Sequence, residues 1–174
     1  MSIVIIGNPN VGKSLVLNGL TGSREFVSNY PGTSVEITSA STKIGAQNII
    51  IYDTPGIYSL LSPGKEPEAV RELLEKEEVS LIVNIVDATN LDRNLFLTLE
   101  LIEMGLPVVV VVNQIDRARE MGLVIDGPML ERMIGVPAIF YSAISGEGTL
   151  NLMEVLEKNQ YKPPKRTARV DRCA

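Results

Sequence analysis

The sequence reads Gly7-Asn8-Pro9-Asn10-Val11-Gly12-Lys13-Ser14 directly after the apolar run Ser2-Ile3-Val4-Ile5-Ile6. This octapeptide satisfies the G-x-x-x-x-G-K-[ST] pattern, with a strand predicted before it and a helix predicted after it. The glycines let the backbone curl so that successive N–H groups point at one anion, and the following helix adds the positive end of its dipole. The stretch therefore predicts a phosphate-binding loop within an α/β fold.

Within this loop, Lys13 is expected to reach the terminal phosphates of a nucleoside triphosphate and Ser14 to ligate Mg²⁺. The alternative is a glycine turn that binds no ligand and carries a surface lysine. The spacing of the motif residues and the predicted strand and helix beside them disfavour this alternative. The residues expected to line the phosphate site are Gly7, Asn8, Pro9, Asn10, Val11, Gly12, Lys13, Ser14 and Leu15.

Length and composition fit one folded domain. The chain has 174 residues, of which 45% are apolar and 21% are charged, as in an ordinary globular domain. We expect that domain over residues 1–160 and a basic tail over residues 161–174. No run approaches the ~20 apolar residues that a membrane span needs, and the first strand begins too early for a signal peptide to precede it.

Two residue types limit the chemistry. The chain contains no histidine and a single cysteine, Cys173. Histidine acid/base catalysis and histidine metal sites are therefore excluded, and one cysteine cannot form an intrachain disulfide. A reducing, cytoplasmic compartment is expected.

The charges are unevenly distributed. The net charge is −5, yet residues 162–174 hold five of the 16 basic side chains and one of the 21 acidic ones. The acidic remainder argues against extended binding to a nucleic-acid backbone, which needs clustered Lys and Arg. The tail could contact a membrane surface or nucleic acid, although a solvated linker is the favoured interpretation.

Apolar runs alternate with amphipathic segments, which is the pattern of parallel strands joined by covering helices. Strands are expected over residues 2–6, 36–44, 47–52, 79–86, 108–112 and 137–141. Helices are expected over residues 13–21, 66–76, 92–104, 128–134 and 148–158, and loops over residues 22–34 and 53–65. Asp126 should begin one of these helices, and Gly105 and Gly135 should end two of them. The runs on either side of Gly45-Ala46 predict an antiparallel hairpin at the edge of the sheet.

A second motif, Asp53-Thr54-Pro55-Gly56, follows the strand over residues 47–52. The carboxylate of Asp53 would lie at a strand end beside the phosphate-binding loop and hold Mg²⁺, usually through water, while the Gly56 N–H reaches the γ-phosphate. Alone, Asp-x-x-Gly marks only a turn. Its position behind the loop makes it a predicted part of the nucleotide site.

A third motif, Asn113-Gln114-Ile115-Asp116, closes the strand over residues 108–112. The Asp116 carboxylate can accept the N1–H and N2 amino protons of guanine, whereas adenine presents a lone pair at N1. Asn113 would engage the base and the neighbouring loop. A fourth motif, Ser142-Ala143-Ile144, would offer the Ala143 N–H to the guanine oxygen. Together these motifs predict GTP rather than ATP.

The order of the four motifs resembles that of the translation-factor-related GTPases. Finer stretches resemble the cytosolic G domain of ferrous iron transport protein B, over about residues 3–156. They are Asn29-Tyr30-Pro31-Gly32-Thr33-Ser34-Val35-Glu36, Asp53-Thr54-Pro55-Gly56-Ile57-Tyr58-Ser59-Leu60 and Asn84-Ile85-Val86-Asp87-Ala88-Thr89-Asn90-Leu91-Asp92-Arg93-Asn94-Leu95. The resemblance implies a three-layer P-loop NTPase fold like that of Ras, with a mostly parallel six-stranded sheet, one antiparallel edge strand and helices on both faces.

The resemblance also assigns a residue that closes over Mg²⁺ in the GTP state. That hydroxyl maps onto Ser34, with Thr33 as the alternative if the loop shifts by one residue. The chain departs from the family, which usually has Trp at Tyr30, Val-Thr at Thr33-Ser34 and Lys at Gln114. Members continue into a helical spacer domain and a membrane-embedded transporter, so the chain is expected to be a fragment or to lack both.

Hydrolysis needs a group other than the usual glutamine. Many GTPases orient the attacking water with a glutamine directly after Asp-x-x-Gly, where this chain has Ile57. In potassium-activated relatives, the asparagine three residues before the loop lysine helps to hold a monovalent cation against the phosphates, which implies a K⁺ site at Asn10. The alternative is that Asn10 only hydrogen-bonds its own loop. We expect slow hydrolysis, stimulated by K⁺, with Asn10, Lys13, Ser34 and Gly56 as the catalytic set.

The leading hypothesis is a GTP-hydrolysing switch, in which GTP orders the loops near Ser34 and Gly56 and hydrolysis releases them. The resemblance implies that it serves a ferrous iron transporter at the cytoplasmic face of the cell membrane, and self-association through these loops is left open. A free-standing ribosome-assembly or RNA-associated GTPase is the alternative, although no nucleic-acid partner is expected. A non-catalytic GDP sensor is a third hypothesis, because Ile57 removes the usual catalytic helper.

Overall fold

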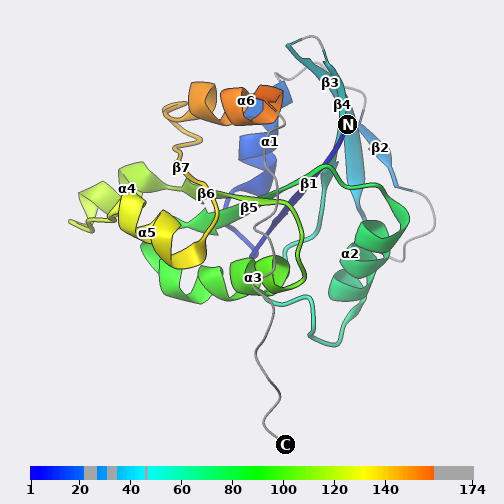
Figure 1. The fold of residues 1–174 in the computed structure, drawn as a ribbon, viewed down its shortest axis with the longest axis horizontal. Helices are drawn as coiled ribbons and strands as arrows, with labels where there is room; N and C mark the ends of the chain where they lie inside the picture. Colours follow the sequence, from blue (N-terminus) through cyan, green and yellow to red (C-terminus); the bar gives the residue numbers. More distant parts are fainter. Residues whose placement is uncertain (22–26, 31–34, 46, 159–174) are drawn as a thin grey trace, which may run out of the picture.

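One sheet of seven strands runs through the molecule in the order β2-β3-β4-β1-β5-β6-β7 (Figure 1). The computed structural model describes residues 1–21, 27–30, 35–45 and 47–158. The strands are β1 (Ser2–Gly7), β2 (Val27–Asn29), β3 (Thr38–Ile44), β4 (Gln47–Asp53), β5 (Leu81–Asp87), β6 (Val108–Asn113) and β7 (Ala138–Phe140). Strands β4, β1, β5, β6 and β7 form a parallel array, whereas β3 is antiparallel to both β2 and β4.

The central strands are buried on both faces. Residues 3–6 of β1 and 108–112 of β6 have no exposed side-chain surface. Parallel strands covered by helices on both sides need such continuous apolar runs, and β-branched side chains pack well on a pleated surface. This burial explains why the strongest apolar runs of the sequence lie at the centre of the sheet.

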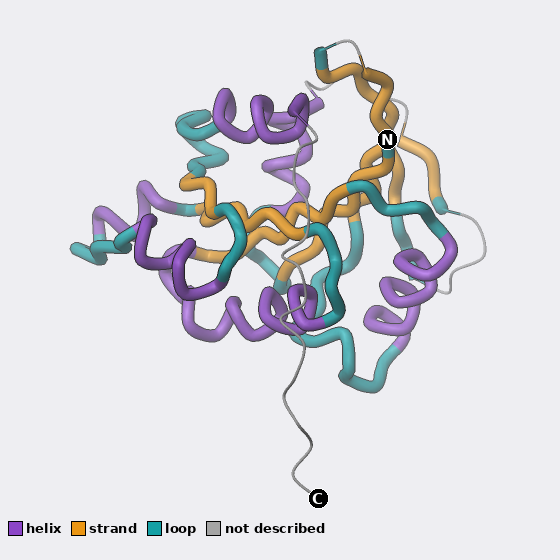
Figure 2. The backbone as a smooth tube through the Cα atoms, viewed as in Figure 1, coloured by secondary structure: helices purple, strands orange, loops and turns teal. Residues whose placement is uncertain are grey.

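Helices cover both faces of the sheet (Figure 2). They are α1 (Lys13–Thr21), α2 (Lys65–Lys76), α3 (Leu91–Glu103), α4 (Ile115–Glu120), α5 (Gly127–Ile134) and α6 (Thr149–Lys158), with the short 3₁₀ helix η1 (Ala88–Asn90) before α3. One apolar cluster joins α1 and α6 to one face. A second cluster joins α2, α3, α4 and α5 to the other face. The molecule is therefore a three-layer α/β structure.

Local signals set several helix ends. The Asp126 side chain accepts a hydrogen bond from the Met129 N–H and caps α5, which ends at Gly135 with φ 73°. Gly105 follows α3 with φ 75°, and its N–H donates to the Ile102 carbonyl oxygen at 2.9 Å. Left-handed residues of this kind are commonly glycines because they lack the Cβ that clashes there. The predicted cap at Asp126 and the predicted ends at Gly105 and Gly135 are confirmed.

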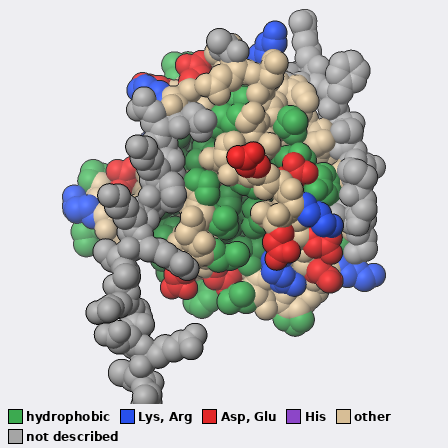
Figure 3. Space-filling model, turned by 45° about the vertical axis from the view of Figure 1, so that its right-hand side comes forward, with side chains coloured by type: hydrophobic (Ala, Val, Ile, Leu, Met, Phe, Trp, Pro, Cys, Tyr) green, Lys and Arg blue, Asp and Glu red, His purple; other side chains and the backbone are tan. Residues whose placement is uncertain are grey.

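Helix α2 shows how amphipathic patterning places a helix on the sheet. It buries Ala69, Val70 and Leu73, while Lys76 and Glu72 form an exposed ion pair at 2.8 Å on its outer side. Figure 3 brings this side of the molecule forward and shows basic and acidic side chains lying next to one another on it. Mixed charge of this kind keeps the outer face of a helix in water.

The predicted fold class is confirmed, but the sheet has seven strands rather than six. The additional strand is β2, a three-residue segment within the region predicted as a loop, so antiparallel pairing extends over two strand pairs. Helix α4 was also missed, because it is only six residues long and begins within the motif Asn113-Gln114-Ile115-Asp116. Elsewhere the elements agree with the prediction to within about two residues.

Several predictions lie outside the described residues: the loop hydroxyls of Thr33 and Ser34, and the basic tail over residues 161–174. Among the residues that the structure does describe, there is no helix of the length and hydropathy that crossing a bilayer requires.

Candidate functional site

The predicted motifs meet at one edge of the sheet. Strand β1 ends at Gly7, β4 at Asp53 and β6 at Asn113, and these strands are parallel members of a continuous sheet. Their carboxyl ends therefore lie side by side, which is where α/β sheets bind ligands. Segments more than 100 residues apart in the sequence are thus brought into one site.

The phosphate-binding loop has the expected geometry. It connects β1 directly to α1, and the Val16 N–H donates to the Gly12 carbonyl oxygen at 3.0 Å as the helix begins. Gly12 has φ 90°, and a Cβ at this position would lie 2.6 Å from the Asn113 side-chain nitrogen. Only glycine satisfies both constraints. The curled loop and the N-terminus of α1 suit an anionic group.

Lys13 is held on this loop by backbone oxygens. Its ammonium group donates to the carbonyl oxygens of Gly7 at 3.2 Å and Asn8 at 3.0 Å. Burial lowers the pKa of Lys13, and the negative charge of Asp53 opposes that shift. A cation that is partly desolvated in this way gains more from a phosphate than one in bulk water, because the local dielectric is lower.

Ser14 and Asp53 form the oxygen pair expected of a Mg²⁺ site. The Ser14 hydroxyl donates to Asp53 Oδ2 at 2.9 Å. Asp53 Oδ1 is buried and has no hydrogen-bond partner among the described residues, and burial raises the pKa of this carboxyl against the Ser14 hydrogen bond and the Lys13 charge. Hydroxyl and carboxylate oxygens are the donors that Mg²⁺ prefers. The residues present therefore fit this metal.

The chain after Asp53 packs closely on the phosphate-binding loop. A Cβ at Gly56 would lie 2.7 Å from the Cα of Pro9, and the Ile57 N–H donates to the Gly7 carbonyl oxygen at 3.2 Å. The Ile57 side chain is buried, with 2% of its surface exposed. Close approach of these two loops requires glycine at position 56. The buried side chain of Ile57 offers nothing to orient a water.

Asn113 joins three of the motifs. Its side-chain NH₂ donates to the Val11 carbonyl oxygen at 2.8 Å, and its side-chain oxygen accepts from the Ala143 N–H at 3.2 Å. The residue is buried. The N–H predicted to recognise the guanine oxygen is therefore directed at Asn113. One side chain thus couples the phosphate-binding loop to the loop after β7.

Two non-glycine residues with left-handed backbone lie in the site. Among the described residues only Asn10, at φ 65°, and Gln114, at φ 62°, have this conformation without being glycine. It is uncommon for side chains other than Asn and Asp, and strained residues concentrate at functional sites. The exposed position of Asn10 on the loop is compatible with a ligand role.

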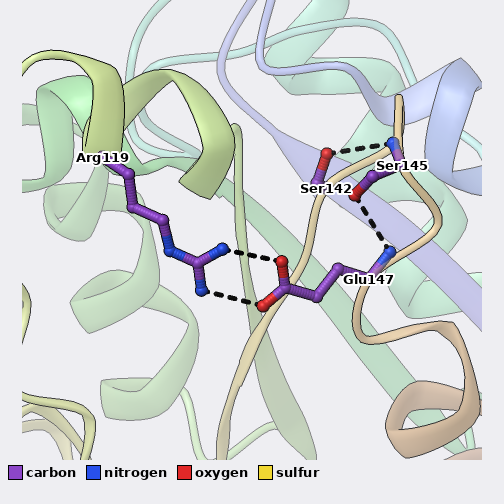
Figure 4. A network of polar contacts seen from close by, with 4 residues as sticks. All are labelled: Arg119, Ser142, Ser145 and Glu147. Atoms are coloured by element: carbon purple, nitrogen blue, oxygen red, sulfur yellow. Dashed lines mark hydrogen bonds and ion pairs between the residues drawn. The ribbon is translucent and has the colours of Figure 1, made fainter.

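The segments predicted to recognise the base include α4 and the loop after β7, and Figure 4 shows Arg119 of α4 beside Ser142, Ser145 and Glu147 of that loop. Asp116 lies in the first turn of α4. Ser142 is fully buried, while Ile144 is 88% exposed. Arg119 of α4 donates two hydrogen bonds to the Glu147 carboxylate, at 2.7 and 2.8 Å. The two segments predicted to bind the base are therefore linked by this ion pair.

Further contacts at the site were not predicted from the sequence. The Ser59 hydroxyl and the Leu60 N–H donate to the Glu100 carboxylate at 2.6 and 2.7 Å. The Arg93 guanidinium lies 4.7 Å from the centre of the Tyr58 ring. Both contacts anchor the loop after Asp53 on α3. No spacing rule in the sequence indicates them, because the partners come from separate elements.

Tyr30, which precedes Thr33 and Ser34 in the sequence, is anchored by Ile37, Glu77 and Tyr52. Its N–H donates to the Ile37 carbonyl oxygen at 2.8 Å, and its hydroxyl donates to Glu77 at 3.0 Å. The ring packs edge-on against Tyr52, with centroids 5.6 Å apart. The hydroxyl of Tyr30 is therefore used in a hydrogen bond, and its ring in an aromatic contact.

Residues 1–156 match the family model described as ferrous iron transport protein B. The chain is 40% identical, over 88% of its length, to an Fe(2+) transport protein A/Fe(2+) transporter FeoB fusion protein of Porphyromonas gingivalis, of which it covers 18%. It is 35% identical to the Fe(2+) transporter FeoB of Escherichia coli K12, with 85% of this chain and 20% of that protein covered. The chain thus spans about a fifth of the length of these relatives.

Solved structures are similar in fold. The cytosolic domain of the T. maritima FeoB iron transporter in its apo form is 32% identical and superposes with a TM-score of 0.87, over 95% of this chain and 66% of that one. A mutant of S. thermophilus NFeoB bound to GDP is 37% identical with a TM-score of 0.81, over 94% of this chain and 62% of that one.

Proposed function

Because the chain belongs to the ferrous iron transport protein B family, we propose that it is a GTP-binding and GTP-hydrolysing switch domain of a ferrous iron transporter. The observation that carries this proposal is the convergence of the nucleotide motifs on Asn113, which contacts both the phosphate-binding loop and the loop after β7. A phosphate site and a base site that share one buried side chain suit a ligand with both parts. GDP is present in the structure of an S. thermophilus relative.

Guanine recognition rests on Asp116 and Ala143. The Asp116 carboxylate accepts the N1–H and N2 amino protons of guanine, and it repels the N1 lone pair of adenine. The Ala143 N–H faces Asn113, and the guanine O6 joins Asn113 as an acceptor for it. Gln114, Ser142 and Ile144, which lie beside these two residues in the sequence, complete the proposed base-binding set. The site therefore distinguishes guanine from adenine by the hydrogen-bonding groups on the edge of the base.

Phosphate binding rests on the loop from Gly7 to Ser14. Its backbone N–H groups and Lys13 hold the β- and γ-phosphates, and the Gly56 N–H reaches the γ-phosphate. Ser14 and Asp53 would hold Mg²⁺, which would supply positive charge to offset that of the phosphates. By the resemblance, Ser34, or Thr33 in its place, would be a further ligand of that metal in the GTP state.

Hydrolysis relies on charge at the loop rather than on a glutamine. Ile57 is buried and apolar, so the chain lacks a water-orienting side chain there. Asn10, which has a left-handed backbone conformation, would supply its side-chain oxygen as a ligand for K⁺. Positive charge at this place stabilises the charge that develops during phosphoryl transfer. We expect slow turnover that rises in K⁺.

The wider setting is a membrane transporter. The relatives are iron transporters in which this region is about a fifth of the protein. A helical spacer and a membrane domain are the proposed partners, at the cytoplasmic face, and the loops near Ser34 and Gly56 are the surfaces that change between nucleotide states. Self-association would use the same surfaces.

Equilibrium binding followed by turnover tests this proposal. Calorimetric titration with GDP and Mg²⁺ should give saturable 1:1 binding, while ADP under the same conditions should not bind. Phosphate release from GTP should then be measured in equal concentrations of KCl and NaCl. Equal affinity for ADP and GDP would contradict the assignment of guanine as the base. Equal rates of phosphate release in KCl and NaCl would show that K⁺ does not stimulate hydrolysis. Binding without phosphate release in single-turnover conditions would favour a GDP sensor.

A further inference from the structure

The loop after β7 is held at two ends by different kinds of contact. At its start the Ala143 N–H donates to Asn113 at 3.2 Å. At its end the Glu147 carboxylate accepts one hydrogen bond from each terminal nitrogen of Arg119 (Figure 4). We call residues 142–147 the base loop. Its N-terminal contact is part of the guanine site, whereas its C-terminal contact lies outside that site.

Hydrogen bonds inside the base loop make it one unit. The Ser142 N–H donates to the Glu147 carbonyl oxygen at 3.0 Å, and the Gly146 N–H donates to the Ser142 carbonyl oxygen at 2.9 Å. The Ser145 N–H donates to the Ser142 hydroxyl oxygen at 3.2 Å, and the Glu147 N–H donates to the Ser145 hydroxyl oxygen at 3.3 Å. A displacement of Glu147 is therefore passed to Ser142 and so to Ala143.

Arg119 has a second acidic neighbour. Asp116 lies three residues earlier on α4, a spacing that places two side chains on one helix face. The hydrogen bonds and charge of Glu147, and then the charge of Asp116, raise the pKa of Arg119. Without Glu147, the guanidinium would be free to turn toward Asp116. There it would compete with the guanine N1–H and N2 protons for the same carboxylate.

From this arrangement we infer that the Arg119–Glu147 pair is a positioning device for guanine binding, which holds the base loop against α4 and keeps Arg119 away from Asp116. The inference rests on the proposed function, because it assigns a purpose to residues around the proposed base site. Bidentate Arg–carboxylate geometry gives directional as well as electrostatic restraint. The pair is exposed, with 61% and 46% of the two side chains accessible, so its effect should be moderate and salt-dependent.

Removing Arg119 and removing Glu147 should have different effects on the rate of GDP release. Arg119→Ala removes only the restraint on the loop, so GDP release should accelerate about two- to fivefold, as for loss of a well-formed exposed ion pair. Glu147→Ala removes the restraint and also frees Arg119 to approach Asp116, so release should accelerate further. In Arg119→Ala/Glu147→Ala no guanidinium remains to compete. The double variant should therefore release GDP at the rate of Arg119→Ala, more slowly than Glu147→Ala.

The experiment is a chase of a prebound fluorescent GDP derivative with excess unlabelled GDP, in stopped flow with Mg²⁺. Glu72→Ala is the matched control, because it breaks another exposed ion pair, with Lys76 at 2.8 Å, on the remote helix α2. Arg119→Lys should fall between wild type and Arg119→Ala, because a lysine retains charge without the two-pronged geometry. Raising KCl from about 0.05 to about 0.5 M should accelerate wild-type release more than that of Glu147→Ala.

Thermal unfolding without nucleotide separates positioning from general loosening. Arg119→Ala and Glu147→Ala should lower the midpoint no more than Glu72→Ala does, while changing release far more. Release at the control rate in both variants, or additive effects in the double variant, would overturn the inference and leave GDP binding intact. If wild type fails to bind the GDP derivative, the proposed function fails first and the inference falls with it.

Discussion

The side-chain amide of Gln114 donates a hydrogen bond to the backbone carbonyl oxygen of Asn10, over 3.5 Å. These are the two described non-glycine residues with left-handed backbone, at φ 62° and 65°. One lies on the phosphate-binding loop and the other in the Asn-x-x-Asp motif. Two energetically costly conformations are therefore placed against one another where the phosphate and base sites meet.

Two substitutions at Asn10 separate the strain of its left-handed backbone from the role of its side chain as a K⁺ ligand. Asn10→Ala removes the amide and also places an alanine in a left-handed conformation, which should lower the free energy of unfolding by about 1 kcal/mol. Asn10→Gly removes the amide without that strain. Both variants should lose stimulation of GTP turnover by KCl relative to NaCl, whereas chemical denaturation should show a loss of stability only for alanine. If K⁺ still stimulates GTP turnover by Asn10→Gly, the Asn10 side chain is not a ligand of the cation.

Asn113→Ala should destabilise the nucleotide-free protein as well as weaken binding. The substitution leaves the buried Val11 carbonyl and the Ala143 N–H without their partner, and an unsatisfied buried group costs about 1–3 kcal/mol. Urea denaturation without nucleotide measures this cost. Asn48→Ala, at an exposed position of β4, is the matched control and should be close to neutral. Equal midpoints for the two variants would mean that the Asn113 side chain does not stabilise the fold.

Asp116→Asn should change the base that is bound. The amide cannot accept both guanine protons, so GDP affinity should fall by about 100-fold or more, as for loss of two charge-assisted hydrogen bonds. Xanthine carries a carbonyl where guanine carries the N2 amino group, and the new amide can donate to it. Titration with GDP and with xanthosine diphosphate makes the comparison, with Asp92→Asn as an exposed control. Undiminished GDP binding by Asp116→Asn would show that the base lies elsewhere.

Asp53→Asn should have opposite effects on stability and on Mg²⁺ binding. Burial raises the pKa of this carboxyl above its ordinary value of 3.8, so the folded, nucleotide-free protein binds this proton more tightly than the unfolded chain does. The resulting stability is present below pH 3.8 and is lost as pH rises through the raised pKa. The amide carries no charge, and the variant should be at least as stable as wild type at neutral pH. Its affinity for GTP should no longer depend on Mg²⁺, whereas chelation with EDTA should weaken GTP binding to wild type. Thermal unfolding of the apoprotein measures the effect on stability. Thermal unfolding of the GTP complex with and without EDTA measures the effect on Mg²⁺-dependent binding. An Asp53→Asn apoprotein less stable than wild type would contradict the expected gain from removing the buried charge.

The edge-on contact between Tyr30 and Tyr52 lies where an alkaline transition is expected. Burial, followed by the hydrogen bond and charge of Glu77, raises the pKa of Tyr52 to about 12. The unfolded chain ionises near the ordinary value of 10.0, so stability present below that pH is lost as pH rises from 10.0 to about 12. Tyr52→Phe should flatten this part of the stability curve, as measured by urea midpoints between these pH values. An unchanged slope would show that another group controls the loss.

The sequence predicted most helices and strands to within a few residues because their signals are local. The apolar run of residues 108–112, the cap at Asp126 and the glycines after two helices each act within one turn or one strand. Strand β2 was missed because three residues carry no periodicity, and it forms only through pairing with β3. The short helix α4 was missed for the same reason: six residues are too few for a helical pattern to be recognised.

For the site, the sequence by itself determined which chemical groups are present: a phosphate-binding loop, a carboxylate at Asp53, a guanine-type acceptor at Asp116 and no water-orienting residue at position 57. Motif spacing carries this information because each motif acts through a short turn. Only the tertiary structure decided which groups touch. It brought Val11, Asn113 and Ala143 together, buried one oxygen of Asp53 and paired Arg119 with Glu147, because each of these contacts joins elements whose proximity depends on strand order and helix packing rather than on neighbouring residues.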